Sequence, residues 1–413
     1  IGLIVAPAHP AAMNRAGLVG FLMVLFWGTA DRIVGQIQSR TLGPYNDVKT
    51  ILNAIMYFVL YHLVLGVRYW SGAVRRDQMS YMYSVGWKWV ANGGWKFMFL
   101  AGLTDTVSEL GGAIAQPYMN GVVYSLMSQV STPGVAFFSL FVLSQRYNSI
   151  EFFALVIVLM GAMIPLVMQL TETEGGIAFP VGYALLVLIT TFAGAISPTL
   201  KELTFKAFRA KAASDTEEGL SAPSMSMQQP GTSVSPLMNE EVNGHQEWAM
   251  PSAELDIFAV ASVAAVFQLI WTPIVLPIER AIAGRNAPFG DAFLCLANRA
   301  PHDEEGPVCQ GAWEMYLLYM FCNAAFNLSI YFTMMKESAI FAYLGIKCTL
   351  PLSTVLYAFN WPLIGATPLN GVIVISVVLV ISGTFVFRTG TRVKAIVQQH
   401  YPGSTACCWP LFG

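Results

Sequence analysis

The chain has 413 residues, of which 55% are hydrophobic and only 11% are charged, and its formal net charge is −2. This composition excludes a soluble enzyme, because a chain this apolar needs lipid around most of its surface. It also excludes a nucleic-acid partner, since there is no basic excess to neutralise phosphates. Because the chain begins at Ile1 rather than Met, the question of a targeting peptide upstream of it stays open.

Long apolar segments predict a series of membrane-spanning helices. A helix needs about 20 predominantly apolar residues to cross a bilayer. Ten segments of this kind follow one another, at residues 17–38, 50–70, 95–115, 121–143, 150–170, 178–203, 254–278, 313–335, 338–360 and 369–388. We therefore expect an all-α integral membrane protein with ten transmembrane helices.

One break interrupts this pattern, between the sixth and the seventh apolar segment. Residues 207–252 are rich in Ser, Pro, Gln, Glu and Gly and show no aliphatic period, which is typical of a disordered linker. The linker separates residues 1–206, with the first five helices and the sixth, from residues 253–393, with the seventh to the tenth. Residues 394–413 then form a tail.

The distribution of Lys and Arg predicts the orientation of the helices. With the N-terminus in the cytosol, the cytosolic side receives fourteen Lys and Arg residues, at helix ends or in loops, and the opposite side receives five. Positive charge is enriched in cytosolic loops, so both termini and the linker are expected in the cytosol. Since five helices per half is an odd number, the second half is expected to be inverted in the membrane relative to the first.

Polar and proline positions recur inside these apolar segments at one fixed separation of 218 residues. The recurring pairs are Asp105 with Asn323, Glu109 with Asn327, Gln129 with Lys347, and Pro133 with Pro351. A charge inside a membrane segment costs free energy, so repeated polarity there indicates function. In transporters built from inverted repeats the solute site lies between the two halves. We therefore place these polar residues along a solute pathway.

Three cations, Arg32, Lys201 and Lys347, lie inside predicted helices. Arg32 follows a long apolar stretch and precedes Gln36 and Gln38, which indicates a polar helix face along a cavity. Its positive charge would repel cationic solutes and attract anionic ones. Lys201 is equally well explained by a side chain that reaches the membrane surface from near a helix end.

Asp105 and Glu109 stand four residues apart and hence on one helix face. A carboxylate that faces a partly dry cavity holds protons more readily than one in water, so both are candidates for proton coupling. The alternative is a neutralising ion pair, for instance Glu109 with Lys347. We favour the structural role for Glu109 and the coupling role for Asp105. Pro133 and Pro351 each interrupt a matched helix and are candidate hinges of a gate.

The loop 280–312, after the seventh helix, is long and half apolar. Its residues Phe293 and Leu294 are typical of an amphipathic stretch on the membrane surface. Cys295 and Cys309 also lie in this loop, on the side opposite to the cytosol, where a disulfide is chemically permitted. Two free thiols are the alternative that the residues leave open.

Several short motifs, spread over the apolar part of the chain, are informative in combination. They are Gln129-Val130-Ser131-Thr132-Pro133, Gln145-Arg146-Tyr147, Lys201-Glu202-Leu203-Thr204-Phe205-Lys206, Phe267-Gln268-Leu269 and Cys309-Gln310-Gly311-Ala312-Trp313. Together they resemble the chloroquine-resistance-transporter family, which belongs to the drug/metabolite transporter superfamily. The similarity extends from about Arg32 to Arg388 without the linker, and no single motif decides it.

This resemblance implies the drug/metabolite transporter fold, with ten helices in two inverted repeats, and export from an acidic compartment. It implies amino acids, peptides and cationic drugs as substrates, and plant members are similar to plastid thiol and glutathione carriers. Residue by residue, it implies a basic residue at Arg32, an acid at Asp105 and a lumenal disulfide between Cys295 and Cys309. A second lumenal Cys pair is absent from this sequence and the linker is long, which puts regulation and compartment in doubt.

We therefore expect a monomeric secondary active transporter that moves small organic solutes across a vacuolar or lysosome-like membrane, coupled to protons or membrane potential. The expected pathway residues are Arg32, Asp105, Glu109, Gln129, Asn323, Asn327 and Lys347. The alternatives are a glutathione or thiol carrier of a plastid envelope and a non-transporting membrane receptor or scaffold. The sequence contains no His-Glu metal motif, phosphate loop or nucleophile elbow, so we expect no enzyme activity, metal or cofactor.

Overall fold

The computed structural model describes residues 15–83, 93–171, 181–221, 255–282, 289–299, 309–336, 339–366 and 369–400. Within these ranges the chain consists of helices and short connections, without a strand, and one isolated bridge joins Trp361 to Gly365. The prediction of an all-α protein is thus confirmed for the described part of the chain.

The helices follow one another along the chain on both sides of the predicted linker. Before it they are α1 (Arg15–Leu42), η1 (Gly43–Tyr45), α2 (Val48–Trp70), α3 (Arg76–Tyr83), α5 (Trp95–Ala115), η2 (Gln116–Tyr118), α6 (Gly121–Met127), η3 (Ser128–Val130), α7 (Ser131–Val142), α8 (Ser149–Thr171), α9 (Val181–Gly194) and α10 (Ile196–Ser221). After it they are α11 (Ile257–Ile282), α12 (Phe289–Leu296), α13 (Ala312–Lys336), α14 (Ala339–Leu356) and α15 (Gly371–His400).

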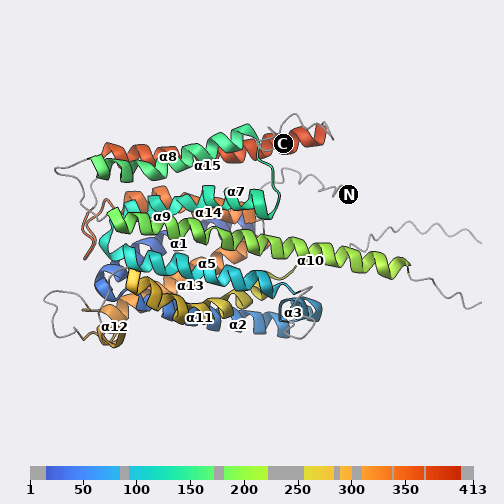
Figure 1. Ribbon diagram of the computed structural model, residues 1–413, viewed down its shortest axis with the longest axis horizontal. Helices are drawn as coiled ribbons and strands as arrows, with labels where there is room; N and C mark the ends of the chain where they lie inside the picture. Colours follow the sequence, from blue (N-terminus) through green and yellow to red (C-terminus); the bar gives the residue numbers. More distant parts are fainter. Residues whose placement is uncertain are drawn as a thin grey trace, which may run out of the picture.

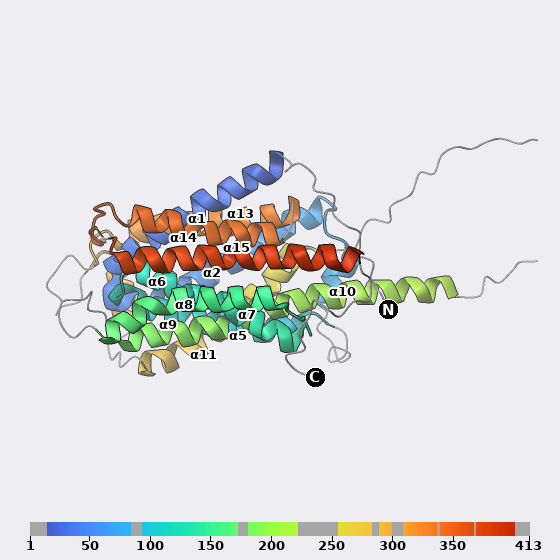
Figure 2. The same cartoon turned by 90° about the horizontal axis from the view of Figure 1, so that it is seen from above.

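The long helices lie side by side in one bundle, with their axes along one common direction (Figures 1 and 2). The short helix α12 lies at one end of the bundle, and the short helix α3 lies at the other (Figure 1). We refer to these as the α12 end and the α3 end. At the α3 end, α10 extends well beyond the neighbouring helices (Figure 2).

Six helical segments in the described ranges are long and apolar enough to cross a membrane. They are Arg15–Tyr45, Val48–Trp70, Gly121–Val142, Val181–Ala212, Ile257–Ile278 and Ala312–Thr333. Shorter apolar stretches occur at Ser149–Ile164, Gly345–Leu356 and Gly371–Phe387. The predicted set of ten spans is therefore confirmed only in part. Helix α5 is missing from this set, and its carboxylates Asp105 and Glu109 lower its apolar character.

Glycines allow the closest helix contacts in the bundle. An added Cβ at Gly383 of α15 would lie 2.9 Å from the carbonyl oxygen of Ala154, and one at Gly161 of α8 would lie 2.9 Å from that of Ser376. Real Cβ atoms do not approach a backbone this closely, so the two glycines let α8 and α15 pack against each other. Gly102 of α5 meets the backbone of α11 in the same way.

Both prolines predicted as hinges lie inside apolar helices. Pro133 is the third residue of α7, directly after the 3₁₀ turn η3, and Pro351 lies inside α14. A proline removes one backbone donor, and a 3₁₀ turn inside a helical run is a common site of bending. Helix α11 contains two further prolines, Pro273 and Pro277, which the repeat pattern did not single out.

Helix α10 enters the segment that the sequence assigned to a linker. It continues to Ser221, because residues 207–218 are rich in Ala, Lys, Arg and Glu, which favour helices. Residues 222–254 lie outside the described part of the chain, as do residues 401–413 of the predicted tail. The predicted linker thus begins with a helix.

Helix α3 is docked on α2 and α11 by the side chain of Tyr83. Its hydroxyl group donates to Ser262 Oγ at 2.6 Å and lies 3.2 Å from His62 Nε2. Burial raises the pKa of Tyr83, so its phenol keeps its proton and remains a donor. His62 Nδ1 lies 2.7 Å from the carbonyl oxygen of Phe58. The two ring nitrogens of His62 therefore both have structural partners.

A disulfide joins Cys295 at the end of α12 to Cys309, in agreement with the implied pairing. Both cysteines are buried in an apolar cluster with Leu42, Tyr45 and Tyr316. The backbone N–H of Cys309 donates to the carbonyl oxygen of Thr41 at 2.8 Å. The disulfide therefore joins α12 to the residues just before α13. The hydrogen bond of Cys309 holds these residues against the end of α1.

Replacing both Cys295 and Cys309 with Ala is expected to lower stability by about 3 kcal/mol, the chain-entropy value for a loop of this length. The measurement is the thermal unfolding temperature of the purified protein in detergent, with and without reductant. The matched control is Cys322→Ala, which replaces a buried free cysteine of α13. An unfolding temperature that reductant lowers equally in both variants would contradict the expected role of the disulfide.

Candidate functional site

Polar side chains meet around the middle of the bundle, where apolar contacts would be expected. They come from α1, α2, α5, η3, α10, α11, α13 and α14. We call this set the central polar cluster: Asp31, Arg32, Lys49, Asn53, Tyr57, Asp105, Glu109, Gln129, Lys201, Gln268, Tyr319, Asn323, Lys347 and Thr349. If all its ionisable Lys, Arg, Asp and Glu side chains are charged, four cations face three carboxylates.

Glu109 joins three helices through its two carboxylate oxygens. Asn53 of α2 donates to Oε1 at 2.7 Å, and Gln268 of α11 donates to Oε2 at 2.5 Å. The amide of Asn53 also lies 3.2 Å from the hydroxyl oxygen of Tyr319 and donates to it. Amide donors can compensate a buried carboxylate for part of its lost hydration. Glu109 therefore connects α2, α5 and α11.

A second carboxylate, Asp31, connects α1 with α13. The amide of Asn323 donates to Asp31 Oδ1 at 2.9 Å, and the hydroxyl of Tyr57 donates to Asn323 Oδ1 at 2.6 Å. The amide of Asn327 donates to the carbonyl oxygen of Asn323 one turn earlier, at 2.9 Å. Asn323 is thus the centre of a chain of hydrogen bonds, and Asn327 supports it from within α13.

The third carboxylate, Asp105, forms an ion pair with Lys201. Lys201 Nζ lies 2.9 Å from Asp105 Oδ2, and the two side chains are 32% and 29% exposed. This contact joins α5 to α10 at the cluster. The interpretation of Lys201 as a side chain that reaches the membrane surface is therefore unsuitable, because the lysine has an acid partner inside the bundle.

The other three cations of the cluster hydrogen-bond neutral groups. Arg32 Nε donates to Thr349 Oγ1 at 3.1 Å, and Lys347 Nζ donates to Gln129 Oε1 at 2.8 Å. Lys49 Nζ donates to the side-chain oxygen of Gln116 at 3.2 Å and lies 4.1 Å from the ring centre of Tyr319. The carboxylate of Asp31 also acts electrostatically on Arg32 and Lys49, and that of Glu109 acts on Lys49. With four cations and three carboxylates, the cluster as a whole carries one positive charge in excess if all of them are charged.

Toward the α12 end, polar side chains of α1 and the following turn bind main-chain carbonyl groups. Gln36 donates to the carbonyl oxygens of Gln116 and Met119 at 3.2 and 3.0 Å. Arg40 donates to the same Met119 oxygen at 3.1 Å, and Asn46 donates to that of Ala113 at 2.7 Å. We call these contacts the α12-end closure, because they hold α1 against the end of α5 and η2. The sequence predicted that Gln36 lies along a cavity, but in the structure its side chain is buried and hydrogen-bonded to main-chain groups.

The structure brings together part of the predicted pathway. Gln129 and Lys347, which are 218 residues apart, are in direct contact. Arg32 lies next to Thr349, which follows Lys347 by two residues on α14. The predicted alternative of an ion pair between Glu109 and Lys347 is replaced by the amide contacts of Glu109 to Asn53 and Gln268. Within the described ranges, no group of three or more metal-ligating side chains occurs.

Several cluster residues, among them Lys49, Asn53, Tyr57 and Tyr319, were not predicted as site residues from the sequence. The charge distribution places Lys49 outside the membrane, but the structure buries it near the start of α2. Asn53 and Tyr57 are four residues apart in an apolar helix, and this spacing indicates a polar face. Lys49 continues the same face one turn earlier. The signal was therefore present as an i, i+4, i+8 series in α2.

The fold and the site together define a polytopic α-helical membrane protein with a charged interior. The family resemblance of the sequence motifs is confirmed, since residues 20–213 match the model of the CRT-like family, described as chloroquine-resistance transporter-like. This family is one of membrane transporters, and the chain is similar to its members on that evidence.

Curated relatives agree with the family match. The protein CLT3, chloroplastic, of Arabidopsis thaliana is 20% identical over 346 residues, which cover 82% of this chain and 64% of CLT3. CLT1, chloroplastic, of the same plant is 20% identical over 86% of this chain and 69% of its own length. Crt homolog 2 of Dictyostelium discoideum is 23% identical over 73% of this chain and 58% of its own length. This chain thus spans less than two thirds of CLT3 and of Crt homolog 2.

One solved structure, titled "Crystal structure of protein", covers 93% of this chain and 100% of its own, with 12% identity and a TM-score of 0.46. A likeness this loose does not bear on the fold or on the function.

Proposed function

We propose that this chain is a secondary active transporter whose central polar cluster binds small organic solutes carrying a carboxylate. Amino acids, small peptides and glutathione belong to this class. The proposal rests on one observation, the gathering of Arg32, Lys49, Lys201 and Lys347 with only three carboxylates inside the bundle. The excess of one positive charge in an apolar bundle creates a positive potential that a solute carboxylate can neutralise. The same potential disfavours solutes with a net positive charge.

The proposed architecture is two inverted repeats of five helices, with the solute site between them. Two observations support it. Gln129 and Lys347 hold equivalent positions in the two halves and touch each other, as expected near an axis that relates the halves. Helices at the same position in the two proposed halves also pack against each other. The second helices are α2 and α11, and the fifth helices are α8 and α15. In this arrangement Pro133 and Pro351 lie at equivalent places and serve as hinges.

In the proposed mechanism the α12-end closure belongs to a state in which the site is shut off from one side. Opening that side requires Gln36, Arg40 and Asn46 to release their carbonyl partners and exchange them for water. Asp105 is the proposed coupling group, because its ion pair with Lys201 is about one-third exposed and so within reach of water. Protons or the membrane potential then drive the cycle. A cytosolic location of the α3 end is supported by the basic residues there, for instance Arg68, Arg75 and Arg76.

The membrane in which the transporter works is proposed from its relatives. The names of CLT3 and CLT1 place those proteins in the chloroplast, which favours a plastid envelope and a glutathione or thiol carrier. The resemblance to the chloroquine-resistance-transporter family favours a vacuolar or lysosome-like membrane. Both alternatives use the same monomeric carrier and the same cationic site, and they differ in the solute.

The test is uptake into proteoliposomes that contain the purified chain. Labelled glutathione, a labelled basic amino acid and a cationic amphiphile are compared, each with and without an imposed pH gradient and membrane potential. We expect glutathione to enter at least about ten times faster than the cationic amphiphile, because of the positive site. Faster entry of the amphiphile would contradict a carboxylate site. No flux of any solute would contradict transport and favour a receptor or scaffold.

A further inference from the structure

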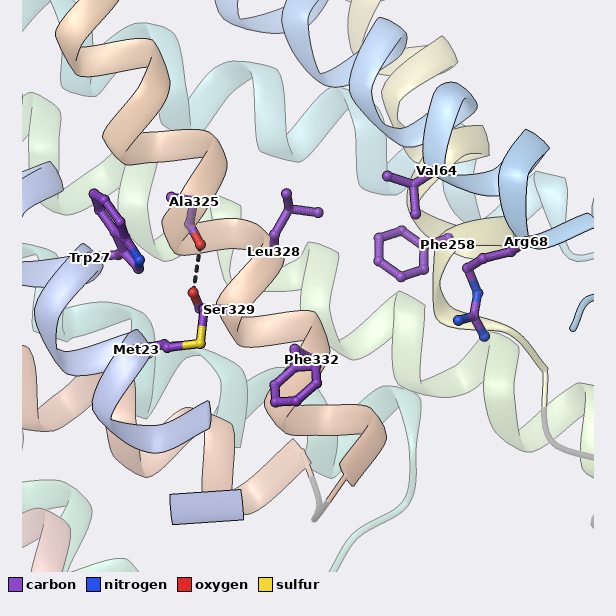
Figure 3. A pocket seen from close by; sticks show the side chains of 9 residues that line it. All are labelled: Met23, Trp27, Val64, Arg68, Phe258, Ala325, Leu328, Ser329 and Phe332. Atoms are coloured by element: carbon purple, nitrogen blue, oxygen red, sulfur yellow. Dashed lines mark hydrogen bonds between the residues drawn. The ribbon is translucent and has the colours of Figure 1, made fainter. Parts of the chain in front are cut away.

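An apolar groove of about 520 Å³ lies between α1 and α13 on one side and α2 and α11 on the other. Figure 3 shows it from close by, with Met23 and Trp27 on α1 facing Val64 on α2 across the C-terminal part of α13. Its lining consists of Met23, Trp27, Val64, Arg68, Phe258, Ala325, Leu328, Ser329 and Phe332. A volume of this size lies within the range of roughly 300–1,000 Å³ that is typical of small-molecule sites.

The lining of the groove is mostly apolar, and its one charged residue, Arg68, lies at one end. Ser329, its only polar lining residue besides Arg68, donates its hydroxyl to the carbonyl oxygen of Ala325 at 2.6 Å and so is satisfied within α13. Along the remaining length the lining offers aliphatic and aromatic carbon atoms, the thioether of Met23 and one indole N–H, that of Trp27. Such a surface suits a hydrocarbon chain much better than a polar solute.

The groove opens toward the membrane. On α1 the residues just before Met23 and Trp27 are Leu22 and Phe26, and both are exposed apolar side chains. On α2 the residues just before Val64 and Arg68 are Leu63 and Val67, which are also exposed and apolar. In a chain that spans a bilayer such side chains face acyl chains. The two walls of the groove are therefore bordered by lipid.

Arg68 marks the level at which the membrane interior ends. It is followed by Tyr69 and Trp70, both exposed, and Trp70 is 91% exposed at the last position of α2. Trp and Tyr collect at the interface between the acyl chains and the headgroups, and Arg side chains commonly point to the same level. The polar end of the groove thus lies at headgroup depth, at the α3 end of the bundle.

The guanidinium group of Arg68 is held in place by an ion pair that occupies only part of its N–H donors. Its Nε and Nη2 atoms both donate to Asp256 Oδ2, at 3.0 and 2.6 Å, and the side chain is 28% exposed. Its Cζ lies 5.6 Å from the ring centre of Phe258, which lines the groove. A guanidinium has five N–H donors, so donors remain for a phosphate group after the contacts to Asp256.

From these observations we infer that the groove binds one phospholipid, with an acyl chain along Trp27, Val64 and Phe332 and its phosphate at Arg68. The occupant is a lipid because exposed apolar side chains border the groove on α1 and α2, and its one charged lining residue, Arg68, lies beside the exposed Tyr69 and Trp70. A negatively charged headgroup is preferred over a zwitterionic one, because it adds charge complementarity at Arg68. The site is separate from the central polar cluster, so it does not depend on the proposed transport function.

The test measures lipid that stays bound to the purified protein, by native mass spectrometry, after titration with phosphatidylglycerol or phosphatidylcholine. We expect one retained lipid, with phosphatidylglycerol roughly fivefold preferred, the size expected for one basic residue near the membrane surface. Ala325→Phe fills the groove and should lower retention of both lipids at least tenfold. Leu318→Phe, at an exposed position of α13 outside the groove, is the matched control and should retain lipid.

The headgroup contact is tested with the double variant Arg68→Gln and Asp256→Asn, which removes both charges and leaves no unpaired carboxylate. It should still retain lipid but lose the preference for phosphatidylglycerol. The control is Arg75→Gln, which removes an exposed arginine outside the groove. Equal retention of lipid by the wild type and Ala325→Phe, or an unchanged headgroup preference in the double variant, would overturn the proposal.

A second measurement needs no variant. A phospholipid with a photoreactive acyl chain is cross-linked to the wild-type protein, and the labelled peptides are identified. Labelling concentrated on residues 23–27 and 325–332 would support the site. Labelling spread over other lipid-facing helices, without these two segments, would overturn it whether or not the variants fold.

Discussion

Replacing Arg32 with Thr and Lys347 with Gln in one chain is expected to lower the uptake of glutathione on the order of 100-fold. Loss of a buried charged contact typically costs roughly 2–5 kcal/mol, and every 1.4 kcal/mol is about a tenfold change in affinity. Arg32 donates to Thr349 and Lys347 donates to Gln129, so the change breaks two hydrogen bonds to neutral acceptors and removes two positive charges from the cluster. The glutamine introduced at position 347 can still donate to Gln129.

The same double variant is expected to admit the cationic amphiphile, because the positive potential that excludes it is reduced. Initial rates in proteoliposomes, normalised to the amount of folded protein, measure both effects. Arg75→Gln is the control, since Arg75 is exposed and contacts Asp77 away from the cluster. If glutathione uptake and exclusion of the cation both persist in the double variant, Arg32 and Lys347 do not act as an electrostatic filter.

Asp105→Asn is expected to abolish solute accumulation driven by a pH gradient while exchange of labelled for unlabelled solute continues. The asparagine keeps a hydrogen-bond acceptor for Lys201 but cannot take up or release a proton. Counterflow exchange does not require net proton movement, so it should remain within about fivefold of the wild-type rate, since a partly exposed ion pair contributes about 1 kcal/mol or less. The two assays, performed on one preparation, separate coupling from binding.

The ion pair with Lys201 offers a second explanation, and a further variant resolves it. If Asp105→Asn acts only by leaving Lys201 without its acid partner, then adding Lys201→Met should restore pH-driven accumulation. If Asp105 is the coupling group, the double variant stays uncoupled. Accumulation that still responds to pH in Asp105→Asn would instead move the proton site to another carboxylate, with Glu109 as the next candidate.

The general fold followed from the sequence because apolar length is a local property. Segments such as Val48–Trp70 and Ile257–Ile278 show their spanning character without reference to neighbours. The exposed pair Phe293 and Leu294 on α12 likewise followed from a local apolar pattern. Helix α10 beyond residue 207 was missed, because a polar composition with few apolar residues suits both a solvated helix and a linker.

The residues of the site could be predicted from the sequence only where a polar residue interrupts an apolar segment. Gln129 and Lys347 stood out because each interrupts an apolar run, and their separation of 218 residues suggested the contact that the structure contains. Lys49 did not, because its burial depends on Gln116 of η2 and Tyr319 of α13, which are far away in sequence. For the same reason the partners of Glu109 on α2 and α11 required the packed structure.

The α12-end closure has a consequence for how this protein tolerates mutation. The donors Gln36, Arg40 and Asn46 are side chains, whereas the acceptors at Ala113, Gln116 and Met119 are main-chain oxygens. Every residue type supplies the same carbonyl group, so side-chain changes at Ala113 and Met119 can leave these hydrogen bonds intact while those at the donors cannot. Natural variation that adjusts how tightly this end is shut is therefore expected to accumulate on α1 and on the turn that follows η1, and not on their partners.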